Sequence, residues 1–375
     1  MKLKLPLAAL ALSCMLGAAH AAPLEKPECI APAKPGGGFD LTCKLAQSGL
    51  LDGKFISSPM RVTYMPGGIG AVAYNTVIAQ RPAEDNTIVA FSGGSLLNLA
   101  QGKFGRYNEN EVRWLAGVGA DYGAVIVADS SPIKSLKDLV AAIKADPTKV
   151  VFGAGGTVGS QDWMKAALTA KAAGLDPKKM RFVAFEGGGE ASTALQGGHV
   201  QVYSGDASEA EEQMKAGAKI RVIAVLADKR LEGKLASVPT AKEQGMDVEW
   251  PIIRGFYMGP KVSDADFKVW VDTFNKMMAT PEFAKLRAER GLFPFAKTGA
   301  EGVFCATLPE KGYGIALKCE DGSTRGAEAM IGAVLAKLFA DDQDLSAKLG
   351  DWSRKTLRNW NGIEVGTIRP VGELA

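Results

Sequence analysis

Residues 149–174 read KVVFGAGGTVGSQDWMKAALTAKAAG. The segment begins with a short apolar strand at 150–152, continues through a glycine-rich loop and enters a helical pattern at 161–173. Ser160 is placed to cap that helix and Gly174 to end it. A strand, a glycine-rich turn and a helix in this order form the repeating unit of an α/β protein.

The same alternation of strand and helix continues along the chain. Ser135 and Asp138 predict the start of a helix that must stop before Pro147. The apolar run at 220–226 is typical of a strand buried on both faces. Ser263 is expected to cap a helix whose buried stripe consists of Phe267, Trp270, Val271, Phe274 and Met278. The sequence therefore predicts an α/β fold of mainly parallel sheets flanked by helices.

Length and composition narrow the class of protein. The chain has 375 residues, enough for two domains, and 47% hydrophobic with 23% charged residues indicates a folded protein. Lys and Arg number 44 against 41 Asp and Glu, which is too balanced for a nucleic-acid-binding protein. Only two histidines occur, His20 and His199, so a multi-histidine metal site is not expected. We interpret His199 as an exposed turn residue rather than a catalytic base.

The N-terminus has the pattern of an export signal over residues 1–21. Lys2 and Lys4 precede an apolar run at 5–16, and residues 19–21 form a small-x-small cleavage site. A buried N-terminal helix is the alternative. No later segment has 18 apolar residues, so we expect a soluble periplasmic protein with its signal cleaved near Ala21.

The cysteines fall into two pairs once Cys14 is removed with the signal. Cys29 and Cys43 are 14 positions apart, and so are Cys305 and Cys319. In an oxidising compartment both pairs are candidate disulfides, with buried free thiols as the alternative. A bridge between Cys29 and Cys43 would enclose the first glycine-rich loop and stabilise the fold by roughly 3 kcal/mol.

Three glycine-rich loops, at 35–40, 153–160 and 185–190, each precede a helix, and the first of these helices is expected to begin near Leu41. Glycine lets a ligand approach the backbone closely, and a helix N-terminus presents unpaired N–H donors with a partial positive charge. Together these features suit a carboxylate or a phosphate. Packing alone also produces glycine-rich turns, but three in one chain favour a ligand site at the carboxyl ends of the strands.

Nucleotide-binding motifs fit poorly. The spacing of Gly153, Gly155 and Gly159 departs from the dinucleotide fingerprint, and no Gly-Lys pair is followed by Ser or Thr. Asp206 follows a strand, where it can either cap a helix at 208–215 or meet a ligand. We expect Asp206 to cap the helix, a role that is compatible with contact to a ligand.

The order of short motifs resembles the substrate-binding receptors of tripartite tricarboxylate transporters. The resemblance runs from about Glu28 to Phe295. It rests on motifs at 35–40, 66–71, 131–139, 152–157, 187–189, 195–198, 238–240 and 243–245.

The resemblance implies a two-lobed periplasmic binding protein of type II-like fold with a ligand cleft between its lobes. The expected divisions are a signal peptide at 1–21, a first lobe at 22–122, a second lobe at 123–224, a return to the first lobe at 225–297 and an atypical segment at 298–375. Closure of the lobes would be a hinge motion biased by ligand. We expect a monomer that delivers its ligand to the membrane subunits of such a transporter.

The resemblance also implies the binding residues. Backbone amides of 36–40 would hold a carboxyl group of a di- or tricarboxylate, and the loop at 155–160 would contribute from the other lobe. Two helix N-termini facing one cleft suit an anion without an Arg clamp. The expected ligand-binding residues are Gly36, Gly37, Gly38, Phe39, Asp40, Ser92, Gly155, Gly156, Thr157, Val158, Gly159, Ser160, Gly188 and Asp206. We expect no catalytic residue, no metal and no cofactor. Gln201 stands where many relatives have Asp, which would argue against amino-acid ligands.

The C-terminal segment departs from this pattern. Residues 298–371 resemble the C-terminal end of the asparaginase family that has a β-lactamase-like serine–lysine site. The part of such an enzyme that carries the nucleophile is not matched, so we expect no amidohydrolase activity. Residues 302–321 predict a β-hairpin, and residues 326–339 predict a helix that could substitute for the missing C-terminal helix of the receptors. The alternatives are a residual amidohydrolase and a non-functional chimera.

Overall fold

The computed structural model describes residues 24–294 continuously. Beyond them it describes 296–298, 303–308, 313–318, 336, 355–358 and 364–368. The predicted signal peptide at 1–21 lies outside the described residues.

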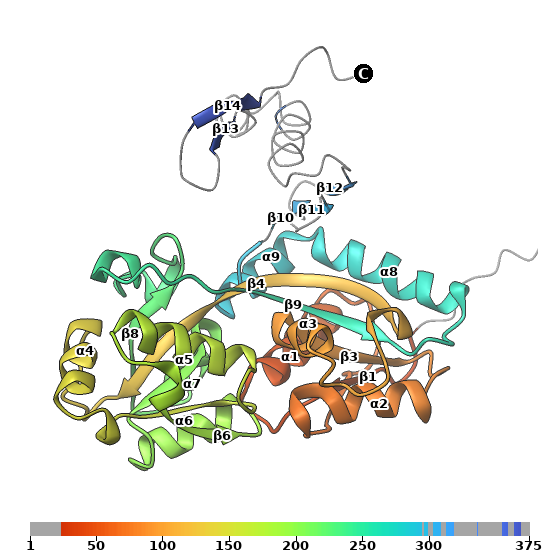
Figure 1. Cartoon of the computed structure of the whole chain (residues 1–375). Helices are drawn as coiled ribbons and strands as arrows, with labels where there is room; N and C mark the ends of the chain where they lie inside the picture. Colours follow the sequence, from red (N-terminus) through yellow and green to blue (C-terminus); the bar gives the residue numbers. More distant parts are fainter. Residues whose placement is uncertain are drawn as a thin grey trace, which may run out of the picture.

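The described chain forms two lobes joined by two strands, β4 (Arg113–Ala128) and β9 (Pro251–Met258) (Figure 1). The sheet of the first lobe has the order β2-β1-β3-β9-β4, and that of the second lobe has β6-β5-β7-β4-β8. The remaining strands are β1 (Glu28–Ala31), β2 (Arg61–Tyr64), β3 (Thr87–Ser92), β5 (Val151–Gly155), β6 (Arg181–Phe185), β7 (Val202–Asp206) and β8 (Ile220–Leu226). One strand in each sheet opposes the others, β9 in the first and β4 in the second, so the expected mainly parallel, two-lobed fold is confirmed.

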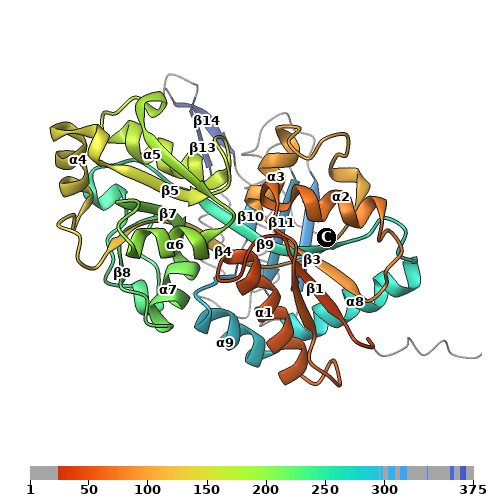
Figure 2. The same ribbon diagram turned by 90° about the horizontal axis from the view of Figure 1, so that it is seen from below.

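The position of the lobe boundary follows from the pairing of β4. Its residues up to Tyr122 pair with β9, and those from Gly123 onward pair with β7 and β8. We therefore define the first lobe as 24–122 with 251–294, and the second lobe as 123–250. The expected return to the first lobe at residue 225 is wrong, because Ala241, Met246 and Val248 pack into a core of the second lobe. The return is β9, which Figure 2 shows passing between the lobes.

Helices cover both faces of each sheet (Figure 1). They are α1 (Gly38–Asp52), α2 (Ala71–Ala79), α3 (Gly93–Ala100), α4 (Leu136–Ala145), α5 (Gln161–Ala172), α6 (Gly188–Gln196), α7 (Ala207–Lys215), α8 (Asp264–Met278) and α9 (Pro281–Glu289). Successive side chains of a strand point to opposite faces. Accordingly Cys29 and Ala31 pack against α1 and α8 residues, whereas Ile30 packs with α2 residues.

Most predicted helix ends are confirmed. Ser135, Ser160 and Ser263 are N-caps whose side chains accept backbone N–H groups. The first helix begins at Gly38, three residues before the expected start, because the extended Gly37 serves as its N-cap.

The disulfide between Cys29 and Cys43 is present and joins β1 to α1, with their Cα atoms 5.7 Å apart. The predicted hairpin is also confirmed, as β11 (Val303–Leu308) pairs antiparallel with β12 (Tyr313–Lys318). In this hairpin Cys305 pairs with Ala316, and Cys319 lies outside the described residues. The expected helix at 326–339 also lies outside them, apart from residue 336. The other described strands are β10 (Ala296–Thr298), β13 (Lys355–Arg358) and β14 (Glu364–Ile368).

We expect the double variant C29S/C43S to lose about 3 kcal/mol in free energy of unfolding, because the bridge restricts the unfolded chain. Urea denaturation of the oxidised wild type and the variant measures the difference. Adding a thiol reductant should lower the stability of the wild type toward that of the variant and leave the variant unchanged. Equal stability of the two oxidised proteins would contradict this expectation.

Within the described residues, no helix combines the length and apolar character needed to cross a bilayer.

Candidate functional site

A narrow cavity lies between the lobes where the N-termini of five helices, α1, α3, α5, α6 and α7, converge. Its volume is about 30 Å³, enough for one or two water molecules. Its lining includes eight of the predicted binding residues: Gly37, Gly38, Phe39, Ser92, Gly155, Ser160, Gly188 and Asp206. These residues come from both lobes, so the structure brings together the first and second glycine-rich loops. We call this space the inner cavity.

A wider hollow of about 410 Å³ adjoins the inner cavity along the seam between the lobes. The predicted residues Gly156 and Thr157 line it, and Ile69 and Ser160 line both spaces. The first lobe adds Asn98 and Lys103. Asn98 is 3% exposed, and its side-chain oxygen has no hydrogen-bond partner among the described residues. We call this space the outer hollow.

Ile69 separates the two spaces in an unusual backbone conformation. Its φ is +48°, which is rare for a β-branched residue. A Cβ atom added at Gly156, where φ is +85°, would lie 2.7 Å from the Ile69 side chain. The two lobes therefore meet at a point that only glycine fits on the side of the second lobe.

Asp40 stabilises the first loop from within. Its carboxylate accepts hydrogen bonds from the N–H of Gly36, the hydroxyl of Tyr64 and the ammonium of Lys44, each at 2.9 Å. Neither Gly36 nor Asp40 lines either space. Asp40 thus fixes the shape of the loop.

The predicted residues Val158 and Gly159 also lie outside both linings, and they contact the first lobe through carbonyl groups. Lys103 donates to the carbonyl of Val158 at 3.0 Å, and Gln101 donates to that of Gly159 at 3.1 Å. These two hydrogen bonds join this part of the second loop to the first lobe.

The backbone N–H groups at the start of α1, where a ligand carboxyl group was expected, face a side chain of the protein itself. We call this place the anion position. The N–H of Gly38 donates to Oε1 of Glu209, a residue of α7 in the second lobe. The other oxygen of Glu209 accepts the hydroxyl of Tyr203 at 2.6 Å. The sequence predicted a ligand carboxylate at this loop and missed Glu209.

A buried network of charges lies beside Glu209. Nη2 of Arg254 contacts Oδ2 of Asp121 at 2.9 Å and Oδ2 of Asp206 at 2.5 Å. Lys165 pairs with Asp206 and, at 2.8 Å, with Asp162. Sequence reasoning missed Arg254, which lines the inner cavity; its guanidinium pairs with Asp121 and Asp206, and the expectation that the ligand needs no Arg clamp stays a prediction. The capping role expected for Asp206 is wrong, since its carboxylate contacts these cations and forms no cap.

The network holds its cations charged. Burial alone would lower the pKa of Lys165, but the carboxylates of Asp162 and Asp206 raise it. Burial, followed by the nearby Asp206 carboxylate, raises the pKa of Glu209 to about 8. The Glu209 carboxyl group therefore titrates near neutral pH.

This raised pKa predicts a pH dependence of stability. Folded Glu209 keeps its proton up to about pH 8, whereas the unfolded side chain releases it near 4.5, so stability falls as pH rises between these values. The variant E209Q cannot titrate and should lose this part of the slope. Denaturant unfolding of both proteins across that pH range measures the effect. Parallel slopes for wild type and variant would contradict the assignment.

Arg254 had a recognisable signal in the sequence. It is the one charged residue in the apolar strand β9, and its side chain is 2% exposed. A single charge within an otherwise buried strand requires a partner, which indicates a polar network. The identity of the partners, Asp121 and Asp206, depends on how β4 and β7 pair.

Gln201 has no part in the site. Its side chain accepts the N–H of Val151 and donates to the carbonyl of Gly198, each at 3.2 Å. This is the end of β7 opposite Asp206, so the expectation that Gln201 argues against amino-acid ligands is wrong. The neighbouring His199 is exposed in a turn, as predicted.

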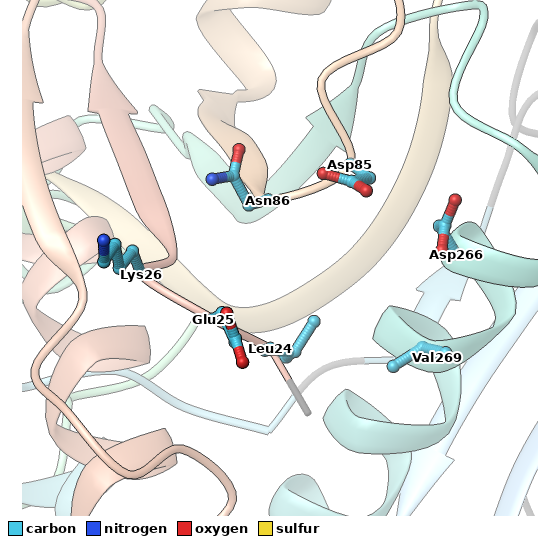
Figure 3. A pocket seen from close by; sticks show the side chains of 7 residues that line it. All are labelled: Leu24, Glu25, Lys26, Asp85, Asn86, Asp266 and Val269. Atoms are coloured by element: carbon cyan, nitrogen blue, oxygen red, sulfur yellow. The ribbon is translucent and has the colours of Figure 1, made fainter. Parts of the chain in front are cut away.

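A separate surface hollow of about 400 Å³ lies at the start of β1 in the first lobe. Figure 3 shows Asp85 and Asn86 on one side of it and Asp266 and Val269 of α8 on another. None of the predicted site residues lines it. Among the described residues, no three His, Cys, Asp or Glu side chains are grouped to hold a metal ion.

Two family models match the sequence. The model described as tripartite tricarboxylate transporter family receptor matches residues 106–302, more than half of the chain. The model of L-asparaginase II matches residues 285–370. A curated relative is the UPF0065 protein in the gbd 5' region of Cupriavidus necator, 26% identical over 263 residues that cover 70% of this chain and 68% of the relative.

Solved structures share the fold. MatC from Rhodopseudomonas palustris with bound malate matches with a TM-score of 0.62 at 16% identity, over 88% of this chain and 98% of that one. A second R. palustris protein, with adipate, matches with a TM-score of 0.63 at 18% identity, over 87% and 97%. The fold is thus that of the periplasmic binding proteins, and the extent of the family match shows that this chain belongs to the tripartite tricarboxylate transporter receptor family.

Proposed function

We propose that this protein is a periplasmic receptor that captures a small organic carboxylate between its lobes. The observation that supports it is the convergence of helix N-termini and glycine-rich loops from both lobes on the inner cavity. Helix N-termini favour negative charge through their unpaired N–H groups and dipoles. The fold supplies the hinge, because among the described residues β4 is the one strand that pairs in both sheets and the chain returns to the first lobe through β9.

The sizes of the inner cavity and the outer hollow suggest which part of a ligand lies in each. The outer hollow has a volume typical of small-molecule sites, whereas the inner cavity is the size of water. We propose that the body of the ligand occupies the outer hollow, near Lys103 and Asn98, and directs one carboxyl group inward. Malate and adipate, which accompany two structural relatives, are acids of suitable size.

Calorimetric titration of the exported protein with malate, succinate, adipate and citrate tests the ligand class. We expect at least one acid to bind, and the corresponding diamide to be silent because it lacks the charge. Silence across the acids in folded protein would overturn the proposal. Delivery to membrane subunits of a tripartite transporter, and action as a monomer, are further parts of this proposal.

The substitution G156V should weaken binding of the acid at least tenfold, because its side chain would meet Ile69 of the other lobe and prevent closure. G174V is the matched control. Gly174 has nearly the same φ, +87° against +85°, but a Cβ atom there meets no other atom. Both variants carry similar backbone strain, so equal affinities would contradict a role for the 156 position.

The substitution G37V should act in the same direction. A Cβ atom there would lie 3.2 Å from the backbone nitrogen of Gly188 across the cleft, so the larger side chain should hold the lobes apart. The same titration measures the effect, and unchanged affinity would place the ligand elsewhere.

The asparaginase-like match suggests a second activity to test. We propose that this segment contributes no catalysis, since only residues 285–370 of this chain match the L-asparaginase II model. Ammonia release from asparagine should equal the buffer background, and release above it would support the amidohydrolase alternative.

A further inference from the structure

The start of α1 lacks a cap of its own. Its N-cap is Gly37, which has no side chain to accept a hydrogen bond. The first N–H groups of a helix need outside acceptors when they are buried. For Gly38 that acceptor is Glu209, 171 positions away in sequence and in the other lobe.

Glu209 is held in this position as a ligand would be. Its side chain is 7% exposed, accepts hydrogen bonds from Gly38 and Tyr203, and lies 3.8 Å from Nη2 of Arg254. A Cβ atom at Gly188 would lie 2.3 Å from both Oε2 of Glu209 and Oη of Tyr203, so the start of α6 leaves room for the carboxyl group. The surroundings thus form a fitted carboxyl site.

The inner cavity also contains an unpartnered polar atom. Gln161 is 8% exposed, and its side-chain oxygen has no hydrogen-bond partner among the described residues. A buried acceptor of this kind indicates a place for a polar occupant. Such an occupant would lie in the same cavity as Glu209.

We propose that Glu209 is a built-in carboxyl occupant of the anion position at the start of α1, which holds the empty lobes together and which a ligand carboxyl group must displace. This inference rests on the proposed function, because it assigns the ligand to the same position. It makes Glu209 a determinant of affinity. A ligand binds only in competition with a group tethered to the receptor.

The test uses the variant E209A, which removes the atoms of one acetate molecule from the side chain. We expect small-angle scattering to show a larger radius of gyration for ligand-free E209A than for wild type. Acetate should bind E209A with a dissociation constant on the order of 1–10 mM, restore the compact shape, and fail to bind wild type. Propionate should bind E209A more weakly, because the vacated space fits acetate.

The matched control is E190A. Glu190 also reaches across the lobes, to Lys34; it lines the outer hollow but not the inner cavity in which acetate is tested. Ligand-free E190A should have the same radius of gyration as wild type and should not bind acetate. Folded E209A that does not bind acetate overturns the proposal. If E209A does not fold, E209D supplies the test, because its carboxyl group is one methylene too short to reach Gly38. A ligand-free E209D whose radius of gyration equals that of wild type would then overturn the proposal.

The outcome separates this inference from the proposed function. Any acid that binds wild type should bind E209A roughly tenfold more tightly. Equal or weaker binding overturns the role of Glu209 and leaves the receptor function standing. Acetate binding by E209A, with wild type silent toward every acid, overturns the proposed ligand class and leaves the role of Glu209 standing.

Discussion

Replacing Arg254 with Met is expected to lower the free energy of unfolding by about 3–5 kcal/mol. The guanidinium is 2% exposed and contacts the buried carboxylates of Asp121 and Asp206. Removing it leaves Asp121 without its cation and Asp206 with Lys165 alone in a low-dielectric interior, and the cost of such uncompensated charge is large. Urea denaturation at neutral pH measures the loss.

R61M is the matched control for this prediction. Arg61 also pairs with a carboxylate, that of Glu28 at 3.1 Å, but its side chain is 71% exposed. Exposed pairs contribute at most about 1 kcal/mol, so R61M should resemble wild type. A loss in R254M no larger than that in R61M would show that the network does not depend on Arg254. Because Lys165 shares Asp206 with Arg254, the losses in K165M and R254M should not be additive.

Replacing Trp270 with Ala should cost about 3–5 kcal/mol by opening a cavity in the core of the first lobe. The indole is fully buried, packs against Phe274 with ring centroids 6.0 Å apart, and donates its N–H to the carbonyl of Asp85 at 2.6 Å. Truncation removes the packing and leaves that carbonyl without its donor. Urea denaturation of W270A measures the sum of the two losses.

W270F separates the two contributions. Phenylalanine retains most of the buried ring and loses only the hydrogen bond, so we expect a cost of about 1–2 kcal/mol. If W270F were as destabilised as W270A, the hydrogen bond rather than the packing would dominate. If W270A were as stable as wild type, the proposed position of Trp270 in the core would be wrong.

Local sequence was sufficient for the elements and for their order. Ser160 caps α5 because a serine hydroxyl next to the first turn is the nearest acceptor for its N–H groups. The β8 strand occupies 220–226, as the apolar run predicted. The disulfide joined Cys29 to Cys43, which local sequence distance already kept within reach. These features depend on residues close together in the chain, so their signals are local.

The partners of the charged residues between the lobes could not be predicted from local sequence. Asp206 has the sequence of a cap, yet its carboxylate pairs with Lys165 and Arg254, which are 41 and 48 positions away. Glu209 reads as an ordinary residue in the first turn of α7, yet it caps a helix in the other lobe. Local sequence patterns do not predict which residues of the two lobes contact each other.

The sequence by itself therefore determined the α/β units, the glycine-rich loops before helices and the family. Only the tertiary structure decided what fills the anion position between the lobes. The physical reason is that hydrogen bonds at a helix end can be satisfied by any acceptor that reaches it, from the helix, a ligand or a distant part of the chain. In this protein the acceptor for Gly38 is Glu209 of the other lobe.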